Sequence, residues 1–208
     1  HDIKAILVAC GTVSTTALPQ LRQESDIPIL GVVEPACRRA AAVTRNRRVG
    51  LIATAASVRS GAYQRSLRQL DPDIAVTAKA CPLFVPLVEN GRFRRGDVVI
   101  ETVAREYLEP LRREGLDTLI LGCTHYPLLT DIIGHIMGPG VTLINTGEEA
   151  AWELKRTLRG LDLLAPEGPA GRATLCASDQ PEQFGVMASY FLGESLTRPV
   201  QPVDIDRY

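Results

Sequence analysis

The sequence has no surplus of charge of either sign. Its 23 Lys and Arg residues face 24 Asp and Glu residues, which gives a formal net charge of −1. Such a balance provides no extended basic surface for nucleic acid or for an anionic membrane. The sequence also lacks an apolar run that approaches the roughly 20 residues needed to span a bilayer, and we recognise no signal peptide. We therefore expect a cytoplasmic protein with neither nucleic acid nor membrane as a partner.

A disulfide framework is also missing. The cysteines are odd in number, widely spaced and set in apolar contexts, unlike those of small secreted domains. We expect all five to be free thiols: Cys10, Cys37, Cys81, Cys123 and Cys176. The chain starts with His1, and a strand is expected almost at once, so we also expect that a segment upstream is missing.

The rest of the chain alternates apolar runs with helical patterns. With 208 residues and 45% hydrophobic content, it can bury one substantial core or two small ones. We expect strands over residues 3–9, 27–33, 49–52, 74–78, 118–122, 141–144 and 173–177, and helices over 14–22, 34–42, 57–70, 97–113, 128–137, 148–161 and 181–191. Residues 81–91 are expected to form a loop and residues 165–171 a linker. Gly115 is expected to stop the helix over 97–113. Trp152 is expected to face inward on the helix over 148–161, and Ser178-Asp179 to cap the helix over 181–191. The strict alternation predicts an α/β fold with mainly parallel sheets covered by helices.

Two of the predicted strands end in the same way. Leu119–Leu121 leads through a glycine to Cys123, and Ile6–Val8 leads through an alanine to Cys10. In open α/β sheets, ligands meet the carboxyl ends of the strands. The repeat predicts two similar lobes, each presenting one thiol to a shared cleft.

A pair of thiols suits proton transfer at a carbon acid. One thiolate can remove the proton from one face while the other thiol returns a proton to the opposite face, and no cofactor is needed. His125, two residues beyond Cys123, could activate that thiol or bind an anionic substrate.

Several segments together resemble the glutamate racemase family. In chain order they are Val8–Cys10, Gly31–Pro35, Ser60–Tyr63, Ala80–Glu89 and Gly122–Leu129. The resemblance extends over nearly the whole chain, in the order of the family's motifs. It implies cofactor-independent interconversion of L- and D-glutamate, which supplies D-glutamate for bacterial peptidoglycan.

The resemblance also implies roles for individual residues. Cys10 and Cys123 would be the two acid/base groups, with His125 assisting Cys123 and Glu89 behind the histidine. Positions that match the family's substrate-binding residues are Gly11, Thr12, Thr54, Ser57 and Thr124. The implied lobes are residues 1–34 with 145–208, and residues 35–144, and a homodimer is possible.

The chain departs from the family pattern in three places. Gly11 stands where the family has asparagine, which removes an amide but keeps a backbone N–H. A Gly-Thr and following Thr of the family appear here as Ala53-Thr54 and Ser57. The family's opening Asp-Ser segment and a later Tyr-Gly loop have no counterpart in these 208 residues.

Other interpretations of the same residues stay open. Cys10, Cys123 and His125 could supply three zinc ligands, although close Cys-x-x-Cys spacing is absent and we expect no metal. The chain could instead racemise aspartate or a related amino acid, or be an impaired homologue that only binds a partner. Cys37, Cys81 and Cys176 are best interpreted as small buried hydrophobes. Glu89 could be a solvated loop carboxylate.

Overall fold

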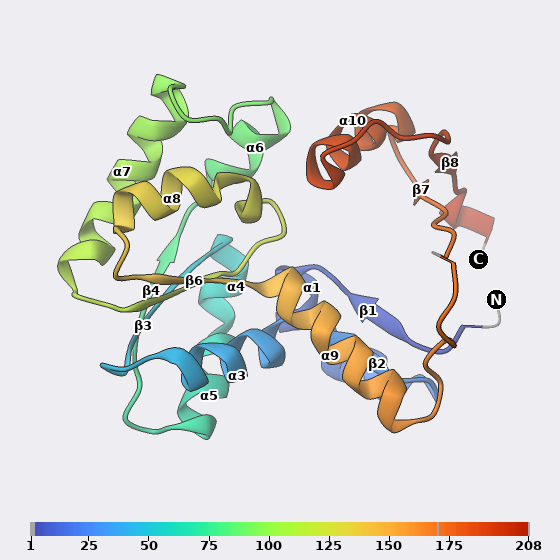
Figure 1. Cartoon of the computed structure of the whole chain (residues 1–208), viewed down its shortest axis with the longest axis horizontal. Helices are drawn as coiled ribbons and strands as arrows, with labels where there is room; N and C mark the ends of the chain where they lie inside the picture. The colour runs from blue at the N-terminus through green and yellow to red at the C-terminus, as the bar shows by residue number, and fades with distance from the viewer. Residues whose placement is uncertain (1–2, 170, 208) are drawn as a thin grey trace. The chain divides into compact units, whose positions relative to one another are not determined.

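The computed structural model describes residues 3–169 and 171–207, and it is an α/β protein built from parallel sheets and helices (Figure 1). One compact unit ends at Leu164, and a second begins at Ala165. The first unit holds β1 (Ile6–Val8), α1 (Gly11–Thr16), α2 (Leu18–Gln23), β2 (Ile29–Gly31), α3 (Val33–Val43), β3 (Arg48–Ala53), α4 (Ala55–Ser60), α5 (Ala62–Leu70), β4 (Ala75–Ala80), α6 (Phe84–Glu89), α7 (Val98–Arg113), β5 (Thr118–Leu121), η1 (Tyr126–Leu129), α8 (Thr130–Met137), β6 (Thr142–Asn145) and α9 (Thr146–Gly160). The predicted fold class is confirmed.

The main sheet has four parallel strands in the order β4-β3-β5-β6. Helices α3 and α5 cover one face, and α7 and α8 lie on the other (Figure 1). Strands β3 and β5 are apolar on both faces, so they are buried almost throughout. The burial of these two strands fixes the position of the residues that follow their carboxyl ends.

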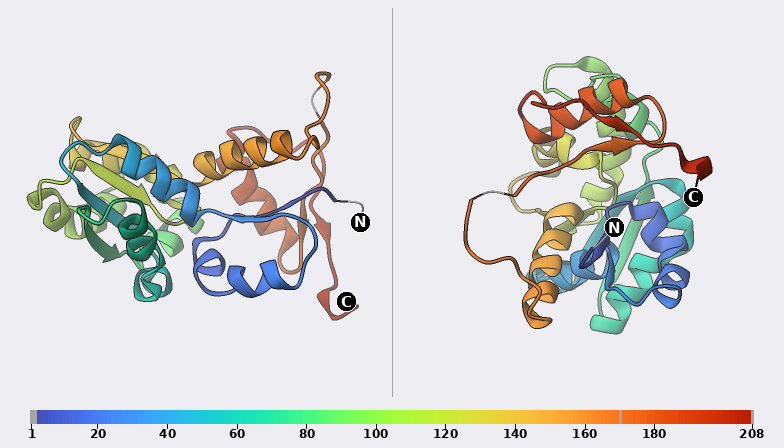
Figure 2. Two further views of the ribbon diagram at one scale, coloured as in Figure 1. Left: turned by 90° about the horizontal axis from the view of Figure 1, so that it is seen from below. Right: turned by 90° about the vertical axis from the view of Figure 1, so that its right-hand side faces the viewer.

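A smaller parallel sheet precedes the main one in the chain. Strand β1 pairs with β2 in parallel, with Val8 opposite Gly31. Helix α9 contacts β2, and Figure 2 shows this helix beside the first strands. Both sheets thus place the end of a strand directly before a predicted thiol.

Proline and glycine explain where the expected helices divide. The helix predicted over 14–22 is two short ones, because the chain breaks at Ala17, shortly before Pro19. The helix predicted over 57–70 is also divided, by Gly61 in the left-handed conformation with a φ of 66°. Gly115 has a φ of 65° just after α7, so the expected stop at this glycine is confirmed.

Four local predictions are wrong. Residues 84–89 form helix α6 within the expected loop, because Pro86 sits in the first turn, where its missing N–H costs little. Trp152 was expected to face inward on α9 but is 53% exposed. Cys176 is exposed rather than buried. Helix α10 takes Gln180 as its N-cap, without a side-chain hydrogen bond from the expected Ser178-Asp179.

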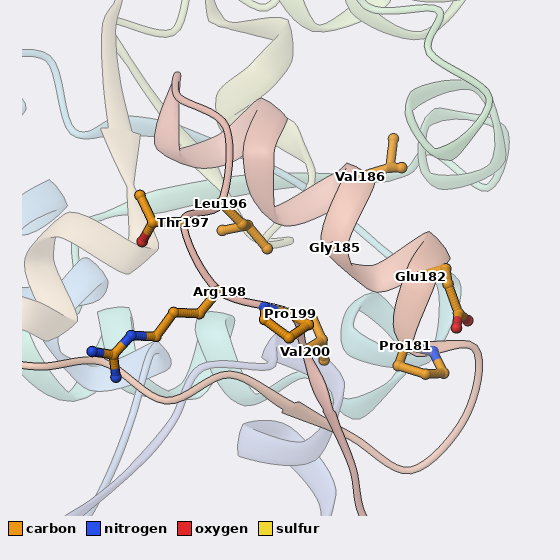
Figure 3. Close-up of a pocket in the computed structure, with 9 residues that line it drawn as sticks. All are labelled: Pro181, Glu182, Gly185, Val186, Leu196, Thr197, Arg198, Pro199 and Val200. Carbon is orange, nitrogen blue, oxygen red and sulfur yellow. The ribbon is translucent and has the colours of Figure 1, made fainter.

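The second unit holds β7 (Cys176–Ala177), α10 (Pro181–Leu192), β8 (Gln201–Pro202) and η2 (Ile205–Arg207). Strands β7 and β8 pair in parallel. The segment before β8 returns along α10 and lines a pocket with it, where Leu196 and Val200 approach Gly185 (Figure 3). The expected linker begins where this unit begins, although its residue 170 lies outside the described residues. The predicted division into lobes at residues 34/35 and 144/145 stays a prediction.

Candidate active site

Both predicted acid/base cysteines follow the carboxyl end of a parallel strand. Cys123 comes after β5, separated from it by Gly122, and its side chain is buried with 8% exposure. Cys10 comes after β1, immediately before α1, and is exposed. All five cysteines are free thiols, as predicted.

The side chains of Cys123, His125 and Glu89 form a row in which each contacts the next. Sγ of Cys123 lies 3.8 Å from Nδ1 of His125, and Nε2 of the same ring lies 3.0 Å from Oε1 of Glu89. The carboxylate can only accept a hydrogen bond, so it favours the tautomer with the proton on Nε2. Nδ1 of that tautomer is free of a proton and can accept one from the thiol.

Burial is the main electrostatic influence on Cys123. It raises the pKa of the thiol, and the nearby Cys10 adds to the increase, while a hydrogen bond from the backbone of His125 opposes it. A raised pKa keeps this thiol protonated at neutral pH. Cys123 can therefore act as an acid at rest and as a base after His125 has taken its proton.

A cluster of hydroxyl groups includes Thr12, which lies two residues beyond Cys10 in the chain. Oγ1 of Thr12, on α1, is 3.0 Å from Oγ1 of Thr54 and 3.4 Å from Oγ of Ser57. Thr54 caps α4, and its Oγ1 accepts a hydrogen bond from the backbone N–H of Ser57. The structure thus brings three of the predicted substrate-binding residues together, and their hydroxyls can donate to a carboxylate or accept from an ammonium group.

The remaining two residues of that set lie close to the thiols. Gly11 is the buried first residue of α1. Oγ1 of Thr124 is 3.5 Å from Nδ1 of His125. Every predicted site residue is therefore in the first unit, at or next to the ends of β1, β3, β5 and α6.

Helix α6, which ends at Glu89, is held by aromatic contacts that the sequence did not reveal. The Phe84 ring packs edge-on against Tyr107 and Tyr126, with centroids 5.2 and 5.3 Å apart. The Tyr126 hydroxyl donates to the carbonyl oxygen of Cys81, just before the helix. Both Phe84 and Tyr126 lie within the family-like segments, and this is the one sign in the sequence that they help to hold the site.

The zinc alternative finds no support in the geometry of the described residues. Within them, no group of three or more His, Cys, Asp and Glu side chains could hold a metal ion. The same part of the chain has no helix long and apolar enough to cross a membrane.

Comparison with known proteins shows the family of this chain. A model of the Asp/Glu/Hydantoin racemase family matches residues 1–154. The chain belongs to the Asp/Glu/hydantoin racemase family. Within that family it is 46% identical, over 196 residues, to the glutamate racemase of Geobacter metallireducens. The alignment covers 94% of this chain and 72% of the relative.

Solved structures of the family show the same fold. Glutamate racemase isoform RacE1 from Bacillus anthracis aligns with a TM-score of 0.90 and 35% identity, covering 98% of this chain and 74% of that one. Glutamate racemase from Francisella tularensis, solved with D-glutamate, aligns with a TM-score of 0.87 and 31% identity, covering all of this chain and 76% of that one. The predicted membership of a racemase family with a two-lobed α/β fold is confirmed, and proteins of this kind act on small molecules.

Proposed function

We propose that this chain interconverts L- and D-glutamate, with Cys10 and Cys123 transferring protons at opposite faces of the α-carbon. The row formed by Cys123, His125 and Glu89 carries this assignment, because it gives one buried thiol a built-in proton acceptor. The relatives named glutamate racemase support glutamate as the substrate.

The reaction begins when one thiolate removes the α-proton, which leaves a carbanion. The opposite thiol then donates its proton to the other face, so that the configuration is inverted. In the direction that uses Cys123 as the base, His125 takes the thiol proton at Nδ1 and becomes a cation. Glu89, at 3.0 Å from Nε2, stabilises that cation. The direction that uses Cys123 as the acid starts from its protonated form.

The hydroxyls of Thr12, Thr54 and Ser57, with Thr124 and the backbone N–H of Gly11, would bind the substrate's carboxylate and ammonium groups. Placing these charged groups fixes the α-carbon between the thiols, which is worth far more to the rate than affinity alone. The balanced charge of the chain fits a small-molecule substrate. The proposed place of the reaction is the cytoplasm, where D-glutamate would supply bacterial peptidoglycan.

Heavy water provides the direct test. Full-length protein incubated with either glutamate enantiomer in heavy water should form the opposite enantiomer with deuterium at the α-carbon. Aspartate, supplied in parallel, should react much more slowly. If neither glutamate enantiomer acquired deuterium, the proposed reaction would be wrong.

Removing one thiol tests its role within the reaction. Cys123→Ser should lower racemisation at least about a thousandfold, because a hydroxyl is a far weaker acid than a thiol and proton transfer commonly contributes about 100- to 10,000-fold. Circular dichroism should show an unchanged fold. Racemisation at the parent rate would exclude Cys123 as a base.

A further inference from the structure

The contact between His125 and Glu89 cannot fix its own geometry. The side chain of His125 is 22% exposed and that of Glu89 is 44% exposed, so water competes for both partners. Partly exposed ion pairs contribute little net free energy, because ordering both side chains offsets most of the attraction. The distance of 3.0 Å between Nε2 and Oε1 therefore depends on how the backbones of the two residues are placed.

Tyr126, the residue after His125, connects these two backbones. Its side chain is fully buried, and its hydroxyl donates a hydrogen bond of 3.1 Å to the carbonyl oxygen of Cys81. That carbonyl oxygen also accepts from the backbone N–H of Phe84, the first residue of α6. The Tyr126 ring packs edge-on against the Phe84 ring. The loop of His125 is thus held at two points against the helix that ends at Glu89.

Both ends of this connection are anchored in the main sheet. The backbone N–H of Tyr126 donates to the carbonyl oxygen of Cys123, 3.1 Å away, directly after the fully buried strand β5. The N–H of Cys81 donates to the carbonyl oxygen of Ala53 at the end of β3. Burial raises the pKa of the Tyr126 hydroxyl, so this group stays protonated and remains a donor over the pH range of an ordinary assay.

We infer that Tyr126 is a positioning residue, which holds the His125 ring against Glu89 through the hydrogen bond of its hydroxyl to the turn before α6. This role rests on the proposed function, because only Cys123 acting as a base needs a histidine that receives its proton. The step that uses Cys10 as the base does not need this histidine. A displacement of about 1 Å in such a site can cost about a hundredfold in rate, so a smaller movement of the ring is measurable.

Tyr126→Phe removes the hydroxyl and keeps the ring. The carbonyl oxygen of Cys81 still accepts from the N–H of Phe84, so no buried acceptor is left unpaired. The Tm should therefore fall by only about 2–4 °C, as the loss of one buried hydrogen bond does in a chain of this size. A change in rate well below the Tm then reflects the site and not a loss of folded protein.

Elimination from 3-chloroglutamate reports on one thiol at a time. A thiolate takes the α-proton, the C–H electron pair forms the C=C bond, and chloride leaves with its bonding pair. The enamine product tautomerises to an imine and is hydrolysed to 2-oxoglutarate and ammonia, which can be measured directly. Each enantiomer presents its α-proton to a different thiol, so Cys123→Ser identifies the enantiomer whose elimination depends on Cys123.

In Tyr126→Phe we expect elimination from the Cys123-dependent enantiomer to slow about tenfold, and elimination from the other to stay within about twofold of the parent. Racemisation, which uses both thiols, should slow as well. Tyr63→Phe is the matched control, because Tyr63 is also fully buried and its hydroxyl has no hydrogen-bond partner among the described residues. This control should keep every rate at the parent level.

A double variant tests whether the tyrosine acts through the carboxylate. Once Glu89→Gln has removed the negative charge, a movement of His125 away from position 89 costs little more. Tyr126→Phe combined with Glu89→Gln should therefore eliminate from the Cys123-dependent enantiomer at a rate within about threefold of Glu89→Gln alone. Independent effects would multiply instead.

Elimination at the parent rate from both enantiomers in Tyr126→Phe would contradict the positioning role. So would an equal loss from both enantiomers, an equal loss in Tyr63→Phe, or effects that multiply in the double variant. A parent protein that racemises neither glutamate enantiomer would instead disprove the proposed function. That result is distinct from an active parent whose Tyr126→Phe variant eliminates from both enantiomers at the parent rate.

Discussion

The carboxylate of Glu89 can stabilise the positive charge that the His125 ring acquires when it takes a proton. Its Oε1 is 3.0 Å from Nε2 of His125, and its side chain is 44% exposed. Replacing it with glutamine keeps an acceptor of similar shape but removes the negative charge. The imidazolium that forms when Cys123 gives up its proton then loses its counter-charge.

We therefore expect Glu89→Gln to lower kcat about tenfold to a hundredfold in the direction that uses Cys123 as the base, with a smaller effect on KM. Steady-state kinetics in both directions, over a range of pH, measure this difference. Glu106→Gln, an exposed carboxylate on α7, is the control and should match the parent. A rise in KM of the same size, with kcat unchanged, would show that Glu89 binds substrate instead.

The buried thiols outside the site make stability depend on alkaline pH. Burial raises the pKa of both Cys37 and Cys81 to about 12, from the ordinary value of 9.0. Below pH 9 both thiols are neutral in the folded and the unfolded chain. Above it the unfolded chain ionises first, so stability is progressively lost as the pH rises toward 12.

Each such thiol should remove about 1 kcal/mol of unfolding free energy per pH unit on average between pH 9 and 10.5, and the slope should approach about 1.4 kcal/mol per unit at the upper end. Urea denaturation at several pH values in that range measures the slope. Cys37→Ala should reduce the slope by one thiol's share, whatever it does to stability at neutral pH. Cys176→Ala, whose side chain is exposed in both states, should leave it unchanged. An identical slope in Cys37→Ala would rule out this origin.

At the scale of elements, α6 shows how packing can override a local signal. Six residues are too few for a helix to be stable by itself. Phe84 and Val88 are fully buried, and the aromatic contacts of Phe84 hold the helix against η1 and α7. The prolines alone favoured a loop, because the sequence does not reveal which distant aromatic rings will meet.

Phe84→Ala should therefore destabilise the protein by about 3–5 kcal/mol, as truncation of a fully buried phenylalanine usually does. Chemical denaturation measures this change. Leu83→Ala is the neighbouring control, since Leu83 is 48% exposed, and it should cost well under 1 kcal/mol. Similar losses in the two variants would mean that α6 is not held through Phe84.

The same contrast separates what was predictable in the site from what was not. The strand ends that carry Cys10 and Cys123 followed from apolar runs and short motifs, which are local. Trp152 was expected inward because it is large and apolar, but periodicity cannot say how wide the covered face of α9 is. The backbone of Gly11 lies so near that of Gly122 that an added Cβ would come within 2.5 Å of the Gly122 carbonyl oxygen. This approach joins residues more than a hundred positions apart in the sequence, so only the folded chain could reveal it.

At the scale of the whole molecule, the chain divides after Leu164 into two compact units. The segment 171–175 that precedes β7 is neither helix nor strand, and Arg172 is exposed. Two other exposed arginines in irregular segments, Arg94 and Arg198, are poorer sites for trypsin. The carbonyl of Arg94 accepts a hydrogen bond from Asp97, and Arg198 is followed by a proline that trypsin does not accept.

Trypsin should accordingly cut first after Arg172, because proteases need an exposed segment whose backbone is not held in regular structure. Mass spectrometry of a brief digest should find a fragment that starts at Ala173, and the first unit should keep its circular dichroism. Arg172→Gln should remove this early fragment and leave later cuts unchanged. A first cut inside the first unit would show instead that its loops open more readily than the segment before β7.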